Sequence, residues 1–274
     1  PYVTVYSTFL QRAYDEISHD VARMNLPVTI MVDHSGLVGS DGETHQGMLD
    51  MAFLNQIPNM TIMAPKDFDE LAEMLEAAVC LKRPVAIRYP RGKQDVHKFD
   101  IHEPISIGKC EVLNEGEDLT IIAIGKMVAK ARNVQEQLLE DGINATVINA
   151  RFLKPLDSEK IKECMLNTGL VVTIEDGIAK GGLGEQIKLL SRKVKVVSFA
   201  YPDEFIKHGT VDEIEEQYGL DDETIYQKCK TLVEKRKARL KKGEEQDIKL
   251  SKSKKDVETK TTKKKNSKTK KKIE

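Results

Sequence analysis

The sequence contains no apolar run of the roughly 18 residues that a membrane-spanning helix requires, so we expect no membrane partner. No basic stretch followed by an apolar segment opens the chain, which argues against a secretory signal. The first residue is Pro1 and not Met, which we interpret as a sign of a fragment or a processed chain. The four cysteines form no Cys-x-x-Cys pair, so we expect core thiols, no metal-ligating residues and a cytoplasmic location.

A dominant charge of one sign is also missing, because two opposite charges cancel along the chain. Residues 241–274 hold 14 lysines and 6 acidic residues, a net charge of +8, whereas residues 1–240 carry −9. The basic segment has almost no large apolar side chains, so residues 237–274 are expected to form a Lys-rich disordered tail. A solvated tail is the favoured interpretation, and weak electrostatic contact with nucleic acid is the alternative.

The remaining residues alternate apolar, strand-like runs with helical patterns, which is typical of an α/β fold with mostly parallel sheets. The clearest helix of the first half covers residues 67–81, where Asp67 is a candidate N-cap and Glu70 follows at the spacing of a capping box. From Leu71, apolar residues recur at i, i+3, i+4 and i+7 and form one face. The other elements predicted here are strands at 3–6, 28–32, 61–63 and 85–89 and helices at 8–24 and 47–55.

A polar, aperiodic stretch separates two such halves, and we place an interdomain linker at residues 96–106, between domains at 1–95 and 107–236. In the second domain a helix over residues 128–140 is expected to end with Gly142 in the C′ position. The other elements predicted here are strands at 119–124, 145–148, 170–174 and 194–199 and helices at 158–164 and 184–190.

The residues that most strongly suggest chemistry follow the strand predicted at 28–32. The loop over residues 33–47 contains four glycines, two aspartates and two histidines. A loop at the carboxyl end of a buried strand is where open α/β sheets bind ligands. Asp41 and His45 place a hydrogen-bond acceptor and a proton-transfer group in this loop. The alternative is a solvated turn whose glycines and aspartates serve only its geometry.

A second cluster follows the first strand, where Tyr6 is succeeded by Phe9 and Arg12. The i, i+3 spacing of Phe9 and Arg12 puts an aromatic ring and a cation on one side of a helix. That combination suits a flat ring next to an anion. The alternative places Phe9 in the core and leaves Arg12 as a surface cation.

Three weaker signals remain. Arg88 and Arg91 flank the end of the strand predicted at 85–89, and arginine suits phosphate or carboxylate, although an interdomain salt bridge is the alternative. His208 either faces a cleft or caps the next helix, and we favour the structural role. The glycines at 181, 182 and 184 lack the Gly-x-Gly-x-x-Gly spacing of a phosphate loop, so a tight packing turn is favoured.

Taken together, these segments resemble the 1-deoxy-D-xylulose-5-phosphate synthase family of the transketolase superfamily. Ordinary transketolases share the Asp-Gly-x-Thr-His-Gln element but not the Tyr-Ser-Thr-Phe-Leu-Gln-Arg segment. The resemblance covers about residues 1–230 and lies in residues 6–15, 36–47, 57–60 and 88–92 of the first half and 149–157, 175–176, 181–182 and 205–209 of the second.

The resemblance implies a truncated pyrimidine-binding thiamine diphosphate domain followed by a transketolase carboxy-terminal α/β domain. It implies thiamine diphosphate and Mg²⁺ as cofactors, with the metal ligands on an amino-terminal portion. The implied reaction condenses pyruvate with glyceraldehyde 3-phosphate, with loss of carbon dioxide, for isoprenoid and thiamine precursor synthesis. Sites in this superfamily form between domains and often between chains, so a homodimer or a complementing amino-terminal chain is expected.

The same resemblance assigns roles to the residues singled out above. Phe9 is expected to stack on the aminopyrimidine of the cofactor, with Arg12 nearby. Asp41 and His45 are expected to be the catalytic residues that contact the reacting carbonyl and hydroxyl groups.

The acceptor phosphate is expected at Tyr6, His34 and Arg91, and here the sequence departs from the family pattern. The family has arginine in an Asp-Arg-Ala-Gly run where this chain has His34. Histidine is shorter and only partly charged near neutral pH. Losing a bidentate partner should weaken phosphate binding by roughly 1–3 kcal/mol.

A larger departure is that the sequence contains neither the Gly-Asp-Gly metal motif of the family nor the stretch with the glutamate that activates the pyrimidine. Two hypotheses follow. The chain is the carboxy-terminal part of a synthase, truncated or split, and inactive alone. Alternatively, it is a non-catalytic paralogue that kept the fold as a binding or assembly module.

Overall fold

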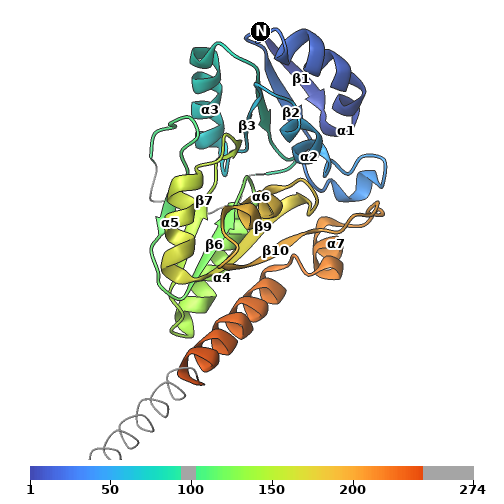
Figure 1. Cartoon of the computed structure of the whole chain (residues 1–274). Coiled ribbons are helices and arrows are strands. Elements are labelled where there is room, and N and C mark those ends of the chain that lie inside the picture. Colours follow the sequence, from blue (N-terminus) through green and yellow to red (C-terminus); the bar gives the residue numbers. More distant parts are fainter. Residues whose placement is uncertain (94–102, 243–274) are drawn as a thin grey trace, which may run out of the picture. The chain divides into compact units, whose positions relative to one another are not determined.

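The computed structural model describes residues 1–93 and 103–242 (Figure 1). This part of the chain divides into a compact unit over residues 1–230 and a second unit from Thr231 onward, of which residues 231–242 are helical. Residues 96–102 of the predicted linker and 243–274 of the predicted tail lie outside the described residues. No helix within the described ranges combines the length and apolarity that crossing a membrane demands.

The first unit contains two five-stranded sheets, which confirms the predicted α/β class with mostly parallel sheets. In the first sheet, β1, β2, β4 and β3 pair in parallel, and β8 joins β3 in antiparallel orientation. In order across the sheet, these strands are β1 (Tyr2–Tyr6), β2 (Thr29–Asp33), β4 (Val85–Arg88), β3 (Thr61–Met63) and β8 (Phe152–Lys154).

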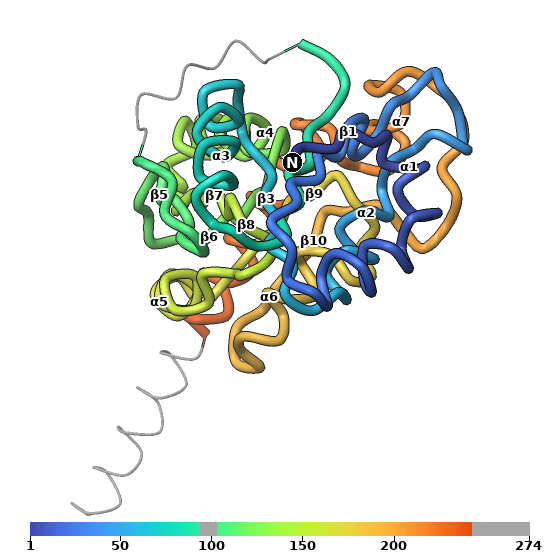
Figure 2. The backbone as a smooth tube through the Cα atoms, turned by 90° about the horizontal axis from the view of Figure 1, so that it is seen from above, coloured from blue at the N-terminus to red at the C-terminus, as the bar shows by residue number. Residues whose placement is uncertain are grey.

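Helices cover both faces of this sheet. Successive residues of a strand point to opposite faces, so neighbouring strand residues pack against different helices. On one face, Met31 packs with Met74 of α3 (Phe68–Leu81), as the predicted apolar repeat requires. On the other, Ile30 packs with Leu10 of α1 (Ser7–Leu10) and Met51 of α2 (Asp50–Asn55). Figure 2 shows α3 and the pair α1 and α2 on opposite sides of the strands.

The second sheet repeats this arrangement with β10, β9, β6 and β7 parallel and β5 antiparallel to β7. Its strands are β10 (Lys195–Tyr201), β9 (Leu170–Ile178), β6 (Leu119–Ala123), β7 (Ala145–Asn149) and β5 (Glu111–Asn114). Its helices are α4 (Met127–Glu140), α5 (Ser158–Thr168), α6 (Leu183–Leu190) and α7 (Val211–Tyr218), and residues 222–230 are also helical.

The structure corrects the predicted elements in several places. The helix predicted at 8–24 is divided into α1, a 3₁₀ turn (Gln11–Ala13) and a π-helix (Glu16–Ala22). Buried Ile17 and Ala22 are five residues apart, which matches the i→i+5 repeat of a π-helix. Two strands, β5 and β8, the helix α7 and the helical residues 222–230 and 231–242 were not predicted. Residues 237–242 are thus helical and not part of a disordered tail as predicted. Gly142, with φ +71°, does follow α4 in the predicted C′ position.

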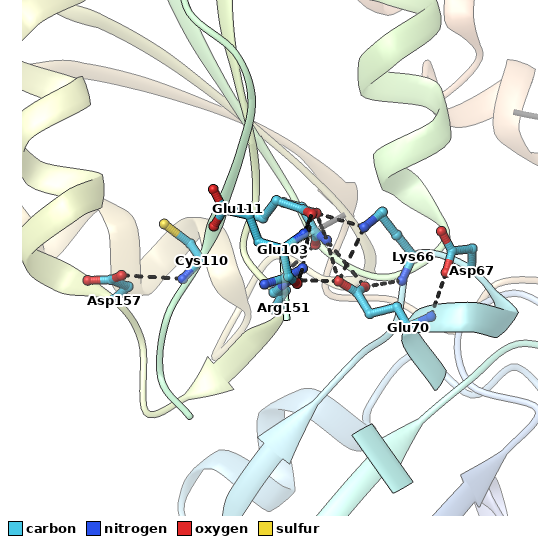
Figure 3. Close-up of polar contacts among 9 residues, drawn as sticks. Lys66, Asp67, Glu70, Glu103, Cys110, Glu111, Arg151 and Asp157 are labelled. Carbon is cyan, nitrogen blue, oxygen red and sulfur yellow. Dashed lines mark hydrogen bonds and ion pairs between the residues drawn. The ribbon is translucent and has the colours of Figure 1, made fainter. Parts of the chain in front are cut away.

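A buried network of charges joins the two sheets (Figure 3). Arg151, just before β8, donates from Nε to Glu70 of α3 at 2.7 Å and from Nη2 to Glu111 of β5 at 2.9 Å. Lys66 completes the network, because its Nζ lies 2.7 Å from Oε2 of Glu111. These four side chains are at most 1% exposed. Asp67 caps α3 as predicted, but the Glu70 carboxylate accepts from Lys66 N–H and does not complete a capping box.

The glycine turn before α6 is held by a second buried carboxylate. Glu175 of β9 accepts hydrogen bonds from the N–H groups of Leu183 and Gly184 at 2.6 and 2.8 Å. This confirms the packing turn, because a protein carboxylate fills the place that a phosphate would take. Burial raises the pKa of Glu175 from 4.5 to about 7, although these two N–H groups oppose the shift.

We expect the Arg151→Met substitution to lower the free energy of unfolding by about 3–5 kcal/mol, because it leaves two buried carboxylates with one cation. Urea denaturation of the purified chain measures the loss. The matched control is Arg132→Met on α4, whose partner Glu136 lies 3.7 Å away at the surface, with an expected cost below about 1 kcal/mol. Equal losses in the two variants would show that the network adds nothing to stability.

We expect Glu175 to make the folded chain less stable as the pH rises through about 7. Its pKa is higher in the folded state than in the unfolded state, so its contribution is complete below about pH 4.5 and is lost as the carboxyl ionises. The unfolding free energy of the wild type, measured against that of Glu175→Gln, should therefore fall by about 3 kcal/mol from pH 4.5 to 8. Parallel pH profiles for the two proteins would contradict this assignment.

Candidate functional site

The loop over residues 33–47 is closed by its own backbone and by one buried side chain. Gly36 and Gly47 exchange N–H to carbonyl hydrogen bonds of 2.8 and 2.7 Å. Gln46 accepts from Val38 N–H at 2.9 Å and donates to the Gly39 carbonyl at 3.2 Å. A Cβ at position 47 would lie 2.3 Å from the His34 carbonyl oxygen, so only glycine fits. The loop is therefore a fixed platform, and Gln46, which sequence analysis did not single out, is its main support.

Four rings meet at the carboxyl ends of β1 and β2. Tyr6 stacks on His34 with ring centroids 4.2 Å apart and an interplanar angle of 18°. His45 meets Tyr6 edge-on at 5.6 Å and Phe9 edge-on at 5.9 Å. Arg12 lies 5.7 Å from the centre of the Phe9 ring. Phe9 is 45% exposed, so it is not the core residue that the alternative interpretation required.

Asp41 connects this ring cluster to Arg91. Arg91 Nη1 donates to both carboxylate oxygens of Asp41, at 2.8 and 3.0 Å. The Tyr6 hydroxyl donates to Asp41 Oδ2 at 3.3 Å. Burial and the Asp41 carboxylate raise the pKa of Tyr6, so its hydroxyl remains a hydrogen-bond donor at neutral pH. His34 Nδ1 lies 2.9 Å from Asp33 Oδ1.

Arg88 is the interdomain salt bridge that was the alternative interpretation of its segment. Its Nε lies 3.1 Å from Asp50 of α2, and its Nη1 lies 2.6 Å from Asp176 of β9. Burial lowers the pKa of Arg88, but Asp176 and Asp50 raise it more strongly, so the guanidinium stays charged. Burial likewise favours protonation of Asp176, but Arg88 and Lys126 hold its pKa below 3.8. Arg91 follows Arg88 closely in the sequence, so the buried contacts of Arg88 fix the start of the segment that carries Arg91.

The seven predicted site residues thus form one connected set, but they do not line a single cavity. Phe9, Arg12 and His45 line a cavity of about 830 Å³, together with Phe205 of the second half. Arg91 lines two other cavities, of about 130 and 660 Å³. The other three, Tyr6, His34 and Asp41, lie between these two regions.

The 830 Å³ cavity fits a flat heteroaromatic ring. Its wall includes the exposed face of Phe9 beside the Arg12 cation, with Leu49, Ile178 and Phe205 as further apolar surface. Within the described residues, no group of three or more His, Cys, Asp or Glu side chains is placed to hold a metal ion. The apolar and aromatic lining of the cavity, with a cation beside the Phe9 ring, suits the pyrimidine end of thiamine diphosphate.

The weaker sequence signals have structural explanations. His208 does not cap the following helix, because Thr210 is the N-cap of α7 and forms a capping box with Glu213. The backbone before it supports the loop instead, since the Lys207 carbonyl accepts from Gln46 at 3.4 Å. Three of the cysteines are buried as expected of core thiols, but Cys80 is exposed.

Two family models match the chain. Residues 1–95 match the model described as transketolase, pyrimidine binding domain, and residues 108–225 match transketolase, C-terminal domain. A solved structure described as a split gene transketolase, an inactive beta4 tetramer, is 30% identical with a TM-score of 0.77 and covers 85% of this chain and 76% of its own. A transketolase from Campylobacter jejuni, 16% identical with a TM-score of 0.69 over 82% of this chain and 34% of its own, shares the fold.

Curated relatives are named 1-deoxy-D-xylulose-5-phosphate synthase. The protein of Caldanaerobacter subterraneus subsp. tengcongensis is 48% identical over 229 residues, 82% of this chain and 37% of the relative. That of Clostridium tetani is 46% identical over 237 residues, 85% of this chain and 38% of the relative. The chain thus spans less than two fifths of these relatives and matches their carboxy-terminal portion. It belongs to the transketolase family, with the pyrimidine-binding and carboxy-terminal domains of that family, and its sequence is similar to those of 1-deoxy-D-xylulose-5-phosphate synthases.

Proposed function

We propose that this chain supplies the pyrimidine-binding and acceptor-binding half of a thiamine diphosphate-dependent 1-deoxy-D-xylulose-5-phosphate synthase. The observation that carries the proposal is the connected set of Tyr6, Phe9, Asp41, His45 and Arg91 at the edge of the first sheet. The reaction joins two carbons of pyruvate to glyceraldehyde 3-phosphate with loss of carbon dioxide. The products serve isoprenoid and thiamine precursor synthesis.

The ring cluster provides the cofactor side of this proposed site. Thiamine diphosphate supplies the electron sink that allows pyruvate to lose carbon dioxide and act as a two-carbon donor. Phe9 presents its exposed face to the pyrimidine, and Arg12 adds a cation beside that ring. His45 stands edge-on to Phe9, where its imidazole supplies a proton-transfer group.

The part of the proposed site around Asp41 binds the acceptor substrate. Arg91 donates from Nη1 to both oxygens of the Asp41 carboxylate, and Tyr6 donates to the same group, so Asp41 is oriented before an acceptor arrives. Asp41 then accepts a hydrogen bond from an acceptor hydroxyl. The acceptor phosphate binds at Tyr6, His34 and Arg91, where the guanidinium of Arg91 suits a phosphate dianion.

The rest of the site, with Mg²⁺ and its ligands, comes from the amino-terminal portion of the synthase, on this polypeptide or on a complementing one. The structural neighbour named as a split gene transketolase supports a complementing chain, because its beta chain alone is described as an inactive tetramer. We expect the completed enzyme to form a homodimer. A non-catalytic paralogue remains the competing function and differs from the proposal in one measurable respect, which is activity after complementation.

We expect no synthase activity from the purified chain with thiamine diphosphate, Mg²⁺, pyruvate and glyceraldehyde 3-phosphate. Adding the amino-terminal portion of the Clostridium tetani relative should restore product formation, measured as 1-deoxy-D-xylulose 5-phosphate by mass spectrometry. In that mixture His45→Ala should lower the turnover by about 100-fold or more, because a positioned proton-transfer group contributes that much. The control Lys188→Gln, at an exposed position of α6, should leave the turnover unchanged. A complex that assembles but yields no product would favour the paralogue.

The phosphate contacts are tested in the same complemented enzyme. Arg91→Ala should raise the KM for glyceraldehyde 3-phosphate by about tenfold or more, and His34→Arg should lower it, because a bidentate donor is removed or gained. The KM for pyruvate should change little in either variant, since pyruvate carries no phosphate. A loss of turnover with both KM values unchanged would instead assign Arg91 a purely structural role.

A further inference from the structure

The helix of the second unit has no buried side between Val233 and Lys242, the last residue that the structure describes. Val233 is 1% exposed, whereas every side chain from Glu234 to Lys242 is at least partly exposed. Leu240 is the one large apolar side chain of that stretch, and it is 53% exposed. A helix that buries no face gains little from packing, so packing contributes little to the stability of residues 234–242.

The same stretch carries cations on all sides of the helix. It contains one carboxylate, that of Glu234, and six cations, which are Lys235, Arg236, Lys237, Arg239, Lys241 and Lys242. Cations at neighbouring helical positions, such as Lys235 and Arg239 at i and i+4, destabilise a helix by mutual repulsion. One carboxylate does not offset six cations, so binding of an anionic partner would stabilise this part of the helix.

The sequence continues this charge beyond the helix and reverses it before the helix. Residues 241–274 hold 14 lysines and 6 acidic residues, whereas residues 1–240 carry a net charge of −9. An anionic partner is therefore repelled by most of the chain and attracted by its carboxy-terminal segment. That segment contains no aromatic side chain from residue 231 to residue 274. Its attraction for a partner is thus electrostatic.

We propose that residues 235–242 bind the phosphate backbone of double-stranded DNA without reading its base sequence. Each residue of a helix rises about 1.5 Å, so the six cations are spread over about 10 Å. Double-stranded DNA carries one negative charge per about 1.7 Å of its axis, so the same length offers about six phosphates. The two charge densities match. A helix about 10–12 Å across also fits the major groove of B-DNA, which is about 12 Å wide.

Other anionic partners suit these residues less well. A helix that lies on a membrane surface inserts a broad apolar face, and here Leu240 is the one large apolar side chain. Proteins that bind single strands stack the bases on aromatic side chains, which residues 231–274 lack. The major groove of duplex RNA is deep and narrow, so side chains of a helix cannot enter it as they enter that of DNA. Duplex DNA is therefore the partner that the charge and the shape of the helix favour.

The proposal is tested on the purified full chain by fluorescence anisotropy with a short labelled DNA duplex of mixed sequence. The logarithm of the association constant should fall linearly with the logarithm of the salt concentration, because each phosphate contact releases counterions. A variant that combines Lys235→Gln, Arg239→Gln and Lys242→Gln removes three cations from one face of the helix, at i, i+4 and i+7. It should reduce the salt slope by about 2–3 and weaken binding at low salt by about tenfold or more. Glutamine is as good a helix former as lysine or arginine, so the helix is kept.

The matched control combines Lys188→Gln, Arg192→Gln and Lys193→Gln, which removes the same charges from exposed positions of α6 and the turn after it. It should leave the salt slope and the affinity for the duplex unchanged, and circular dichroism verifies that both variants are folded. Equal salt slopes for the wild type and the helix variant, or no binding at low salt, would overturn the proposal. Tighter binding of duplex RNA, of single-stranded poly(U), of phosphatidylglycerol vesicles or of polyglutamate than of the DNA duplex would also overturn it. None of these measurements depends on synthase activity.

Discussion

The arrangement of this molecule depends on a buried guanidinium that is shared between its two halves. Arg88 ends a central strand of the first sheet, is 2% exposed, and bonds Asp50 in its own half and Asp176 in the other. Arg88 uses Nε for Asp50 and Nη1 for Asp176, so each carboxylate has its own nitrogen of the guanidinium. Removal of Arg88 would leave two carboxylates without their cation in a low-dielectric interior. The two sheets are therefore held where both carboxylates reach Arg88, and the chain leaving Arg88 is directed to the Asp41 loop.

A second buried network provides the same constraint at the carboxyl end of β3, beside the end of β4 that carries Arg88. Arg151 takes a left-handed backbone conformation, with φ +57°, directly before β8, the strand that the second half contributes to the first sheet. Its ion pairs to Glu70 and Glu111 require α3 and β5 to be close. Backbone pairing and ion pairing thus act together, which explains why two family domains form one compact unit over residues 1–230.

The sequence predicted those parts of the fold that depend on local patterns. Apolar runs gave the central strands, and the Asp67 cap and the repeat from Leu71 gave α3, because both signals lie within one turn or one strand. The strand β8 has only three residues, too few for an alternating pattern. The partners of Arg88 and Glu70 were also beyond prediction, since Asp176 is 88 residues from Arg88 and Arg151 is 81 residues from Glu70. Long-range ion pairs of this kind leave no periodic trace in the chain.

The candidate site could also be predicted only in part from the sequence, as His34 shows. The sequence showed that an expected arginine is absent, but not that the replacing ring would stack on Tyr6 at 4.2 Å or adopt φ +55°. In that geometry histidine keeps the flat contact that a guanidinium would make with Tyr6. It does not keep the permanent charge of a guanidinium. Positive charge for an acceptor phosphate beside Tyr6 and His34 must then come mainly from Arg91, which reaches this cluster through Asp41.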